Sequence, residues 1–429
     1  MAGDGHRGRV EALKFIHAAD LHIDSPLRGL DRYEGAPVDQ LRGASRRAFI
    51  ALVDLALDEH VDLVVLAGDI FDRDLGDFRA ALFFRQQVIR LTQTGIKVFV
   101  VKGNHDAEGQ ITRKLPELNG LHVFSAKAAE TIDLPELGVA VHGRSFPDRA
   151  VPEDLTPSYK NPIPSRFNIG VLHTSLTGRV GHDPYAPTDI ATLSAKGYDY
   201  FALGHVHARE VVREANPRIV FPGNLQGRHV GETGSKGCEL IEIDGARIVS
   251  AEHVSLDVVR WHQLKLSADG LTSVNALAQR FQQECDNLVV GIEDRLHAVR
   301  VLVVGESELH QHEAAEPGTL AAALQAATQD FAKAPVWVES VRLALRSPID
   351  RTALQQREDA VGEVLRIVDE MRGQGSGMRE WLLQSLDKLP PLPSDLNDMD
   401  PGRLSDVDLD ALLADAEATV LSKLTGAEA

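Results

Sequence analysis

Five short polar clusters, each directly after an apolar run typical of a strand, constrain this chain more than any other feature. They are Asp20-Leu21-His22, Gly68-Asp69-Ile70-Phe71-Asp72, Gly103-Asn104-His105-Asp106, the single His173, and Gly204-His205-Val206-His207. In open α/β sheets, ligands bind beyond the carboxyl ends of the strands. If the five ends converge, their Asp, His and Asn side chains form a two-metal site able to cleave phosphate esters. The sequence therefore predicts a metal-dependent hydrolase.

Each cluster also has an ordinary structural interpretation. Asp20 and Asp69 can each cap the segment that follows, and Gly103-Asn104 is a common turn sequence. A single histidine after an apolar strand, such as His173, is more often a core residue than a ligand. The metal site is favoured because all five clusters occur in order, each at the end of a predicted strand.

The residue types indicate which metal and which proton donor to expect. A mixed shell of His, Asp and Asn suits manganese, iron or zinc rather than calcium. Two cations about 3.5–4 Å apart would activate a water and neutralise phosphate oxygens. The leaving group then needs a proton, and His105 is the candidate donor. Asp72 is the carboxylate expected to orient the His105 imidazole and to raise its pKa.

Apolar and amphipathic stretches alternate in the first part of the chain and predict an α/β fold. The first predicted strands are Lys14–Ala19, Leu63–Ala67, Lys97–Val101, Phe167–Leu172 and Tyr198–Leu203. Helical spacing fills two of the gaps, at Gln40–His60 and Phe78–Thr94, which predicts βαβ units and a largely parallel sheet. Later strands without long helices between them predict a second, more antiparallel sheet packed on the first. These are Val139–His142, Ile219–Phe221, Glu239–Ile243 and Ile248–His253.

The pattern changes near Ser255 to β-α-β-α-β, which is compact enough for a separate small domain. Its predicted elements are the strands Trp261–Leu266, Ala298–Val304 and Val336–Leu345 and the helices Ser273–Cys285 and Leu320–Phe331. Thr352–Met371 is predicted as a helix that resumes, after a glycine-rich break, as far as Leu386. Leu389–Pro393 has the composition of a stiff linker, and Leu404–Leu424 has the pattern of an acidic amphipathic helix.

Composition and charge limit the class of protein and its partners. A length of 429 residues suggests two or three domains. Cys238 and Cys285 match no zinc spacing and form no disulfide framework, which favours a reducing, cytoplasmic compartment. No secretory signal is evident, and no apolar run approaches the length of a membrane span. A net charge of −18 argues against a general basic coat, so DNA contacts require a local patch, a metal or a partner subunit.

Taken together, the five clusters resemble the calcineurin-like metallophosphoesterase superfamily, whose motifs are Asp-x-His, Gly-Asp-x-x-Asp, Gly-Asn-His-Asp, His and Gly-His-x-His. Within it, Phe15–Pro26 and Phe221–His229 are most similar to the SbcD-type DNA repair exonucleases, especially the YhaO-like branch. This resemblance implies a four-layer α/β/β/α sandwich over residues 1–255 and a small α/β capping domain over 256–346. A helical segment (347–388) and a linker with the acidic helix (389–429) would form a helical C-terminal extension.

The resemblance also implies a role for each motif residue. One metal would be held by Asp20, His22, Asp69 and His207, and the other by Asp69, Asn104, His173 and His205. His105 would be the transition-state or acid residue, held by Asp72, although some DNA nucleases of this type carry another residue there. His17, Asp24 and His142 match no ligand position and are expected to be structural or to support the ligands.

Basic side chains and one helix are candidates for contacts with DNA and with a partner. Arg228, His229 and Lys236 lie in a glycine-rich stretch that would present donors to a phosphodiester backbone, or would form a solvated loop. A basic run is interpreted as a solvated helix face, with a phosphate track as the alternative; it comprises Arg28, Arg32, Arg42, Arg46 and Arg47. Related nucleases act with an ABC-type coiled-coil ATPase, so Leu404–Leu424 is expected either to bind such a partner or to fold back on its own domain.

The predicted function is a metal-dependent DNA exonuclease in DNA repair, with endonuclease activity and a homodimer also compatible. Its cofactors would be two divalent ions, manganese first, with iron or zinc as alternatives. The competing functions are a phosphatase or phosphodiesterase acting on a small or protein substrate, and a non-catalytic scaffold for an ATPase. The capping-like domain favours DNA, the acidic charge favours a small or protein substrate, and the complete ligand set argues against the scaffold.

Overall fold

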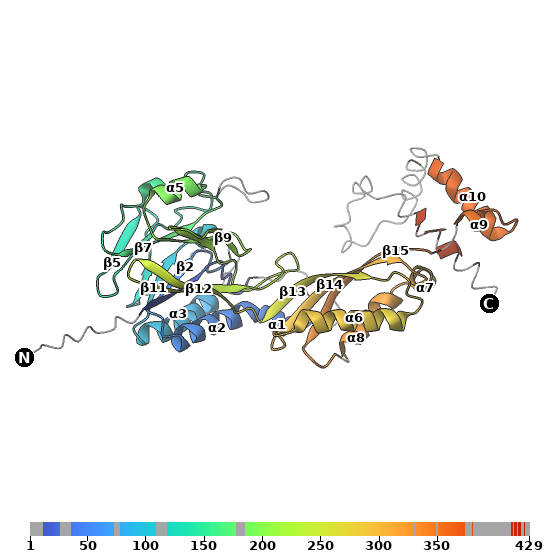
Figure 1. Ribbon diagram of the computed structural model, residues 1–429, viewed down its shortest axis with the longest axis horizontal. Helices are drawn as coiled ribbons and strands as arrows, with labels where there is room; N and C mark the ends of the chain where they lie inside the picture. The colour runs from blue at the N-terminus through green and yellow to red at the C-terminus, as the bar shows by residue number, and fades with distance from the viewer. Residues whose placement is uncertain are drawn as a thin grey trace, which may run out of the picture. The chain divides into compact units, whose positions relative to one another are not determined.

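The computed structural model describes residues 12–25, 36–72, 78–108, 118–176, 185–329, 331–348 and 351–373, together with positions 380, 413, 414, 416, 417, 419–421 and 424. The chain divides into two compact units (Figure 1). The first unit comprises Met1–His262 with Ile292–Ala298, and the second comprises Gln263–Gly291 with Val299–Ala429.

The first sheet of the first unit has the strand order β12-β11-β1-β2-β3-β4. Its strands are β1 (Leu13–Ala18), β2 (Leu63–Ala67), β3 (Lys97–Val101), β4 (Leu121–Val123), β11 (Gly237–Asp244) and β12 (Arg247–Ser255). Strands β1 to β4 run parallel to one another, whereas β11 pairs antiparallel with both β1 and β12. The carboxyl ends of β1, β2 and β3 therefore lie along one edge of this sheet.

The second sheet of the same unit has the order β5-β6-β7-β8-β10-β9. Its strands are β5 (Glu130–Leu134), β6 (Val139–Gly143), β7 (Phe167–His173), β8 (Tyr200–Gly204), β9 (Glu210–Arg213) and β10 (Arg218–Phe221). The four central strands are parallel, and only the two edge strands are antiparallel to their neighbours.

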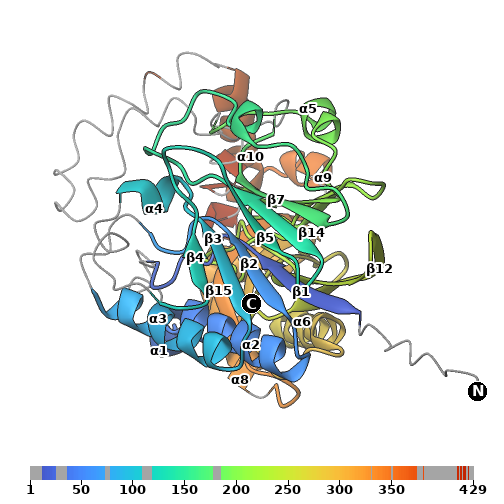
Figure 2. The ribbon, with the colours of Figure 1, turned by 90° about the vertical axis from the view of Figure 1, so that its left-hand side faces the viewer.

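Three apolar cores hold the two sheets and their helices in four layers. The helices α2 (Ala44–Asp58) and α3 (Phe78–Gln93) pack on the outer face of the first sheet. The inner faces of the two sheets share a core that includes Phe15, Val65 and Tyr200. The helix α5 (Ile190–Ala195) packs outside the second sheet, and Figures 1 and 2 show the two helical layers on opposite sides of the strands. The predicted α/β/β/α sandwich is confirmed.

The prediction of strand membership was wrong in two respects. Strands β7 and β8, expected in the first sheet, lie in the second, and the β11–β12 hairpin, expected in the second, extends the first. The second sheet is also mainly parallel rather than antiparallel. The sequence predicted antiparallel pairing because no long helix separates these strands. In the structure the β6–β7 crossover is instead a long segment with one short 3-10 turn, η3 (Thr156–Ser158), and no α-helix. Its buried Phe146, Val151 and Leu155 cover the sheet as a crossover helix would.

Two predicted helices are each divided in the structure. The stretch Gln40–His60 forms α1 (Val38–Arg42) and α2, with Gly43 between them. The stretch Thr352–Met371 forms α9 (Arg351–Gln355) and α10 (Ala360–Gly373). The carboxylate of Asp359 accepts the backbone N–H of Gly362 at 3.1 Å, which caps α10 and marks a new helix start.

The second unit contains a three-stranded sheet, β13-β14-β15, with an apolar core between the sheet and its helices. Its elements are β13 (Val259–Ser267), β14 (Leu296–Glu306), β15 (Val336–Arg346), α6 (Val274–Val289), α7 (Leu309–Ala315) and α8 (Thr319–Gln329). The β-α-β-α-β pattern matches, with α7 as an unpredicted addition. No helix among the described residues is long and apolar enough to cross a bilayer.

The predicted linker Leu389–Pro393 and most of Leu404–Leu424 lie outside the described residues. The described positions of the latter segment are helical, and Leu421 and Leu424 pack with Val361 and Leu365 of α10. Glu417 also pairs with Arg372 at 3.3 Å. These contacts are of the kind expected in the alternative in which the acidic helix folds back on its own chain.

Candidate metal centre

All five polar clusters follow the carboxyl ends of parallel strands from both sheets. Asp20 and His22 follow β1, and Asp69 and Asp72 follow β2. The short helix α4 (Asn104–Glu108) begins directly after β3 and carries Asn104 and His105. His173 is the last residue of β7, and His205 and His207 follow β8. The arrangement is the one expected for a binding site at strand ends.

The backbone at several of these positions lies in the left-handed region that non-glycine residues rarely adopt. The φ angles are 52° at Asp20, 42° at His22, 51° at Asp69 and 102° at His205. Such conformations cost about 1–3 kcal/mol each and persist where the surrounding structure imposes them, most often at functional sites. The surrounding structure therefore holds the backbone at these four positions in an uncommon conformation.

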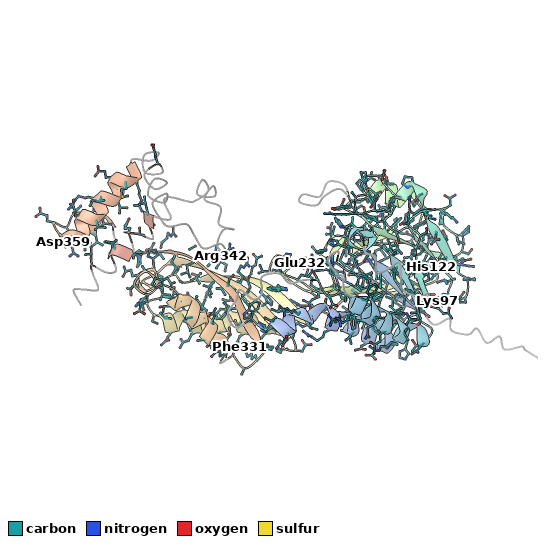
Figure 3. All side chains as sticks on the ribbon, turned by 180° about the vertical axis from the view of Figure 1, so that it is seen from behind. Lys97, His122, Glu232, Phe331, Arg342 and Asp359 are labelled. Atoms are coloured by element: carbon teal, nitrogen blue, oxygen red, sulfur yellow. The ribbon has the colours of Figure 1, made fainter. Side chains whose placement is uncertain are left out.

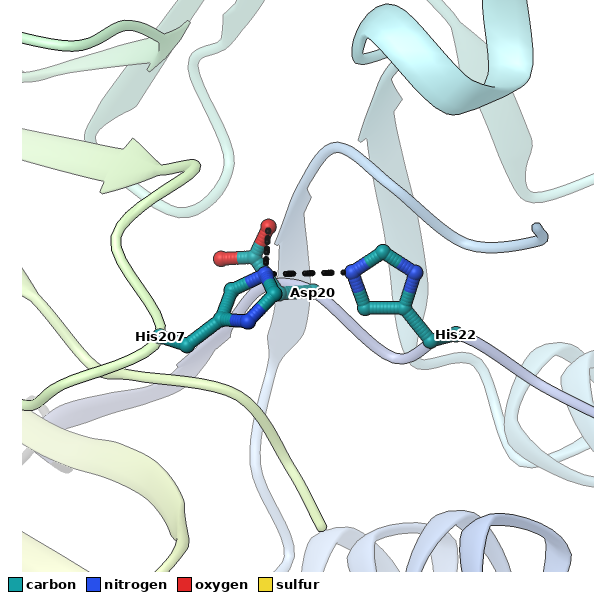
Figure 4. Close-up of side chains that lie close together, drawn as sticks. All are labelled: Asp20, His22 and His207. Atoms are coloured by element: carbon teal, nitrogen blue, oxygen red, sulfur yellow. Dashed lines mark hydrogen bonds and ion pairs between the residues drawn. The ribbon is translucent and has the colours of Figure 1, made fainter. Parts of the chain in front are cut away.

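The first ligand group consists of Asp20, His22 and His207 (Figure 4). The Nε2 atoms of His22 and His207 are 3.2 Å apart, and His207 Nε2 is 3.9 Å from Asp20 Oδ1. The Nδ1 atom of His22 contacts Asp72 Oδ1 at 3.0 Å, and Nδ1 of His207 contacts Glu232 Oε1 at 2.7 Å.

Those two carboxylates determine what the Nε2 atoms can do. An ionised carboxylate only accepts hydrogen bonds, so Nδ1 of each imidazole carries the proton. In the neutral rings each Nε2 then carries a lone pair and no proton. The two Nε2 atoms therefore cannot form a hydrogen bond with each other, although they are 3.2 Å apart. Burial lowers the pKa of His22, which favours its neutral form. Two lone pairs about 3 Å apart suit ligands of one ion at about 2.0–2.2 Å from each.

The second candidate group was expected to be Asp69, Asn104, His173 and His205. The structure brings the ligand atoms of Asp69 and His173 together with those of Asp20. The Nε2 atom of His173 lies 3.0 Å from Asn104 Oδ1 and 3.5 Å from Asp69 Oδ2. Its Nδ1 contacts the Ala67 carbonyl at 2.9 Å, which makes Nε2 the atom available to a metal. The ring of His205 lies 5.2 Å from that of His173, and its backbone N–H donates to Asp20 at 3.0 Å.

Asp69 lies between the two groups. Its Oδ2 is 3.5 Å from His173 Nε2 and 4.0 Å from His22 Nε2, while Oδ1 accepts the backbone N–H of His105 at 2.9 Å. Burial alone would raise the pKa of Asp69, but the imidazoles of His173 and His22 hold it below its usual range. An ionised carboxylate in this position can bridge two cations.

Glycines leave the space that the ligands occupy. A Cβ atom at Gly103 would lie 2.2 Å from Asp69 Oδ1 and 2.8 Å from His173, and one at Gly68 would lie 2.3 Å from His173 Nδ1. Gly68 also has a φ of 96°. The glycines of these motifs are therefore required by the packing of the ligands.

Asp72 holds two histidines with one oxygen. Its Oδ1 is 2.8 Å from Nδ1 of His105 and 3.0 Å from Nδ1 of His22. Burial opposes ionisation of Asp72, but the hydrogen bonds from His105 and His22 outweigh it and keep its pKa below the usual range. The His105 side chain remains 24% exposed.

Two carboxylates at the centre were missed as functional residues. Asp106 accepts the backbone N–H groups of Ile70, Phe71 and Gly103 at 3.0–3.1 Å and so ties the loop after β2 to the start of α4. Glu232, labelled in Figure 3, contacts His207. Asp106 lies inside a recognised motif, which is a usable signal, whereas Glu232 has no spacing that marks it.

The three basic residues considered for DNA contacts, Arg228, His229 and Lys236, differ in their surroundings. Arg228 has its NH1 atom 3.7 Å from Asp72 Oδ2, and the side chain of His229 is 64% exposed beside Glu232. The Nζ atom of Lys236 donates to the His207 carbonyl at 2.7 Å. Lys236 is thus joined to the backbone of His207, a contact that the sequence did not indicate.

Residues expected to be structural have structural contacts. His17 bonds Tyr200 and Leu203, and His142 bonds Thr131 and Asn168. Asp24 pairs with Arg46, which also lies over the Phe83 ring at 4.9 Å. Within the basic run, Arg46 is thus engaged locally, and Arg28 and Arg32 lie outside the described residues.

Comparison with known proteins identifies the class. A family model described as calcineurin-like phosphoesterase matches residues 13–209, and one described as the middle domain of metallophosphoesterase YhaO matches residues 261–346. The chain belongs to the calcineurin-like metallophosphoesterase family and is a hydrolase of phosphoesters by class. The resemblance in the motifs is confirmed.

Three individual relatives show which members of the family the chain is similar to. The chain is 35% identical over 279 residues to "Uncharacterized metallophosphoesterase YhaO" of Bacillus subtilis (strain 168), covering 64% of this chain and 68% of that protein. It is 26% identical to DNA double-strand break repair protein Mre11 of Sulfurisphaera tokodaii, covering 60% and 66%. It is 24% identical to a subunit of the nuclease SbcCD of Bacillus subtilis, covering 71% and 84%. The chain thus spans about two thirds of the first two relatives.

Proposed function

We propose that this protein is a metal-dependent DNA exonuclease, with endonuclease activity compatible, that hydrolyses phosphodiester bonds in DNA repair. The observation that carries the proposal is the convergence of two ligand groups on Asp69, with the His105–Asp72 pair beside them. The choice of DNA is supported by the likeness to proteins named as a break-repair protein and a nuclease subunit.

In the proposed mechanism Asp20, His22, Asp69 and His207 would hold one divalent ion, and Asp69, Asn104, His173 and His205 would hold the other. Two such ions would supply Lewis acidity at the phosphate and an activated water, with manganese as the first candidate and iron or zinc as alternatives. Asp69 would be shared by the two ions, since its Oδ2 lies 3.5 Å from His173 Nε2 and 4.0 Å from His22 Nε2. The glycines at 68 and 103 keep its surroundings open.

His105 is proposed as the proton donor to the leaving oxygen. Asp72 fixes the His105 ring through Nδ1 at 2.8 Å, so Nε2 is the atom presented to substrate. Arg228 is proposed to bind a phosphate oxygen, because its guanidinium lies beside Asp72 at the centre. The exposed imidazole of His229 would contact the same backbone nearby.

The domain division proposed with this function places the nuclease domain in residues 1–255 and the capping domain in 256–346. The helical segment 347–388 and the region 389–429 would then contain the contact for an ABC-type coiled-coil ATPase. The packing of Leu421 and Leu424 on α10 suggests that such a partner would meet a helical assembly rather than an isolated helix.

A second candidate is a phosphatase or phosphodiesterase that acts on a small or protein substrate. The net charge of −18 favours it, because an acidic surface repels a polyanion. A catalytically silent scaffold is the weakest alternative, since it has no chemical use for the His105–Asp72 pair.

Cleavage assays separate these candidates. The purified chain would be incubated with labelled linear duplex, single-stranded DNA and bis-p-nitrophenyl phosphate, with Mn²⁺ or with EDTA. We expect Mn²⁺-dependent cleavage of DNA, abolished in His105→Ala and retained in His122→Ala, whose imidazole pairs with Glu130 away from the centre. Hydrolysis of the small ester with intact DNA would support the second candidate instead. No metal-dependent hydrolysis of any substrate would contradict both enzymes.

A further inference from the structure

A single buried carboxylate, Glu232, joins the first ligand group to the loop that carries Arg228. Glu232 is 8% exposed, and both of its oxygens are engaged. Oε1 contacts Nδ1 of His207 at 2.7 Å and the Arg228 guanidinium at 3.1 Å. Oε2 accepts the Asn224 side-chain amide at 2.8 Å and the backbone N–H of Arg228 at 2.7 Å. One oxygen therefore faces the centre and the other organises the loop.

The proton between His207 and Glu232 can be placed from these contacts. The Nδ1 atom of His207 also lies 3.2 Å from a nitrogen of Arg228, which can only donate. Nδ1 cannot accept from Arg228 and donate to Glu232 at once. The shorter contact, to a carboxylate that only accepts, assigns the proton to Nδ1 and leaves Nε2 for a metal.

The loop between Gly223 and Glu232, here called the Arg228 loop, is fixed at its start. The side-chain oxygen of Gln226 accepts the backbone N–H groups of Val258 and Val259 at 2.9 and 3.2 Å. Gly223 has a φ of 81°, and a Cβ there would lie 3.0 Å from the His207 carbonyl oxygen. In the part from Arg228 to Glu232, the Glu232 carboxylate accepts from the Arg228 backbone and guanidinium, as given above. The stretch also has two internal bonds, from the Glu232 N–H to the His229 carbonyl at 2.8 Å and from the Gly231 N–H to His229 Nδ1 at 3.1 Å.

We propose that Glu232 is a positioning residue that couples metal binding by His207 to the placement of the Arg228 loop. A cation on Nε2 of His207 makes the Nδ1 proton a stronger donor and tightens its bond to Glu232. Glu232 then holds the backbone of Arg228, and the guanidinium is kept beside Asp72. The coupling is reciprocal, so a loop held in place also favours the metal. The proposal rests on the metal site of the proposed function and not on its choice of DNA.

The test uses the whole chain without substrate. Mn²⁺ binding to Glu232→Gln would be measured by isothermal titration and by electron paramagnetic resonance. We expect the affinity of one of the two Mn²⁺ sites to fall about 10–100-fold, with the other site changed much less.

Glu239 provides a matched control. It is fully buried and accepts from Arg209 at 2.6 Å, and it pairs with His253 at 3.3 Å. Glu239→Gln removes an equally buried charge from a histidine that is not a candidate ligand. A loss of Mn²⁺ affinity in Glu239→Gln as large as in Glu232→Gln would overturn the proposal, because it would mark a general effect of destabilisation.

Hydrogen exchange on the unaltered chain decides the matter if Glu232→Gln does not fold. Adding Mn²⁺ should slow exchange of the amides from Arg228 to Glu232 more than that of the hairpin β11–β12. Equal protection of that stretch with Mn²⁺ and with EDTA would overturn the coupling. If Mn²⁺ protects this stretch as expected but the unaltered chain does not cleave DNA, the proposed substrate is contradicted and this inference stands.

Discussion

At the scale of single residues, the centre is organised by acceptors shared between histidines. Asp72 Oδ1 binds Nδ1 of both His22 and His105, one a candidate ligand and the other the candidate acid. Holding Nδ1 in both rings leaves both Nε2 atoms for chemistry. One side chain would therefore serve both the proposed metal binding by His22 and the proposed proton transfer by His105.

Replacing Asp72 by Asn should reduce both the rate of phosphoester hydrolysis and the affinity for Mn²⁺. The amide cannot hold two imidazole N–H groups as a carboxylate does, so kcat on bis-p-nitrophenyl phosphate should fall about 10²–10⁴-fold. Mn²⁺ affinity at the site of His22 should fall about tenfold in the same variant. Steady-state kinetics and Mn²⁺ titration measure the two effects. A fall in kcat with unchanged Mn²⁺ affinity would show that Asp72 serves His105 alone.

The motif residues could be predicted from sequence because their types, order and positions after apolar strands all agree. Glu232 could not, because a carboxylate in a glycine-rich loop has the same local pattern whether it is solvated or buried against His207. The contact of Lys236 could not be predicted for the same reason: its charge does not reveal that its Nζ donates to the His207 carbonyl.

At the scale of elements, His17 joins the two strands that lead into the first ligand group. From β1 it contacts the Tyr200 hydroxyl on β8 at 2.9 Å and the Leu203 carbonyl at 3.1 Å. The strands could be located from apolar runs, but their partners could not. In β11, Cys238 belongs to the helix-covered core and Ile241 to the core between the sheets, so its pattern does not specify which sheet it joins.

His17 should make the fold sensitive to mild acid. Burial lowers its pKa to about 4, with Glu239 and Leu203 opposing, against an ordinary value of 6.5. The unfolded chain thus binds the proton more readily, so the stabilisation is complete above pH 6.5 and is lost as pH falls toward 4. The loss between pH 7 and pH 5 should be about 2 kcal/mol.

Urea unfolding in EDTA at pH 7 and pH 5 checks this expectation. His17→Gln should be less stable at pH 7 and should lose about 2 kcal/mol less than the unaltered chain between the two pH values. Parallel losses in the two proteins would show that His17 is not the group responsible.

At the scale of the whole molecule, the charge of −18 limits how DNA could be bound. In the described part of the basic run, Arg46 pairs with Asp24 and Arg47 donates to the Gln40 carbonyl, so these two guanidinium groups have partners within the chain. Among the residues that the structure describes, Arg228 is the guanidinium placed beside Asp72. DNA binding by this chain alone should therefore depend on the metals and a small number of phosphate contacts.

The salt dependence of DNA binding measures the number of phosphate contacts. With about two phosphate contacts, affinity for a labelled oligonucleotide should fall roughly tenfold between 50 and 200 mM salt. Proteins with 6–10 such contacts lose about 10³–10⁵-fold over the same range. Fluorescence anisotropy with the His105→Ala variant would give the slope, and a loss near 10³-fold would reveal an extended basic surface.

Anomalous diffraction from crystals soaked in Mn²⁺ tests the central claim most directly. Two peaks should lie about 3.5–4 Å apart on either side of Asp69, one against His22 and His207 and the other against Asn104 and His173. A single peak, or peaks away from Asp69, would contradict the two-metal centre.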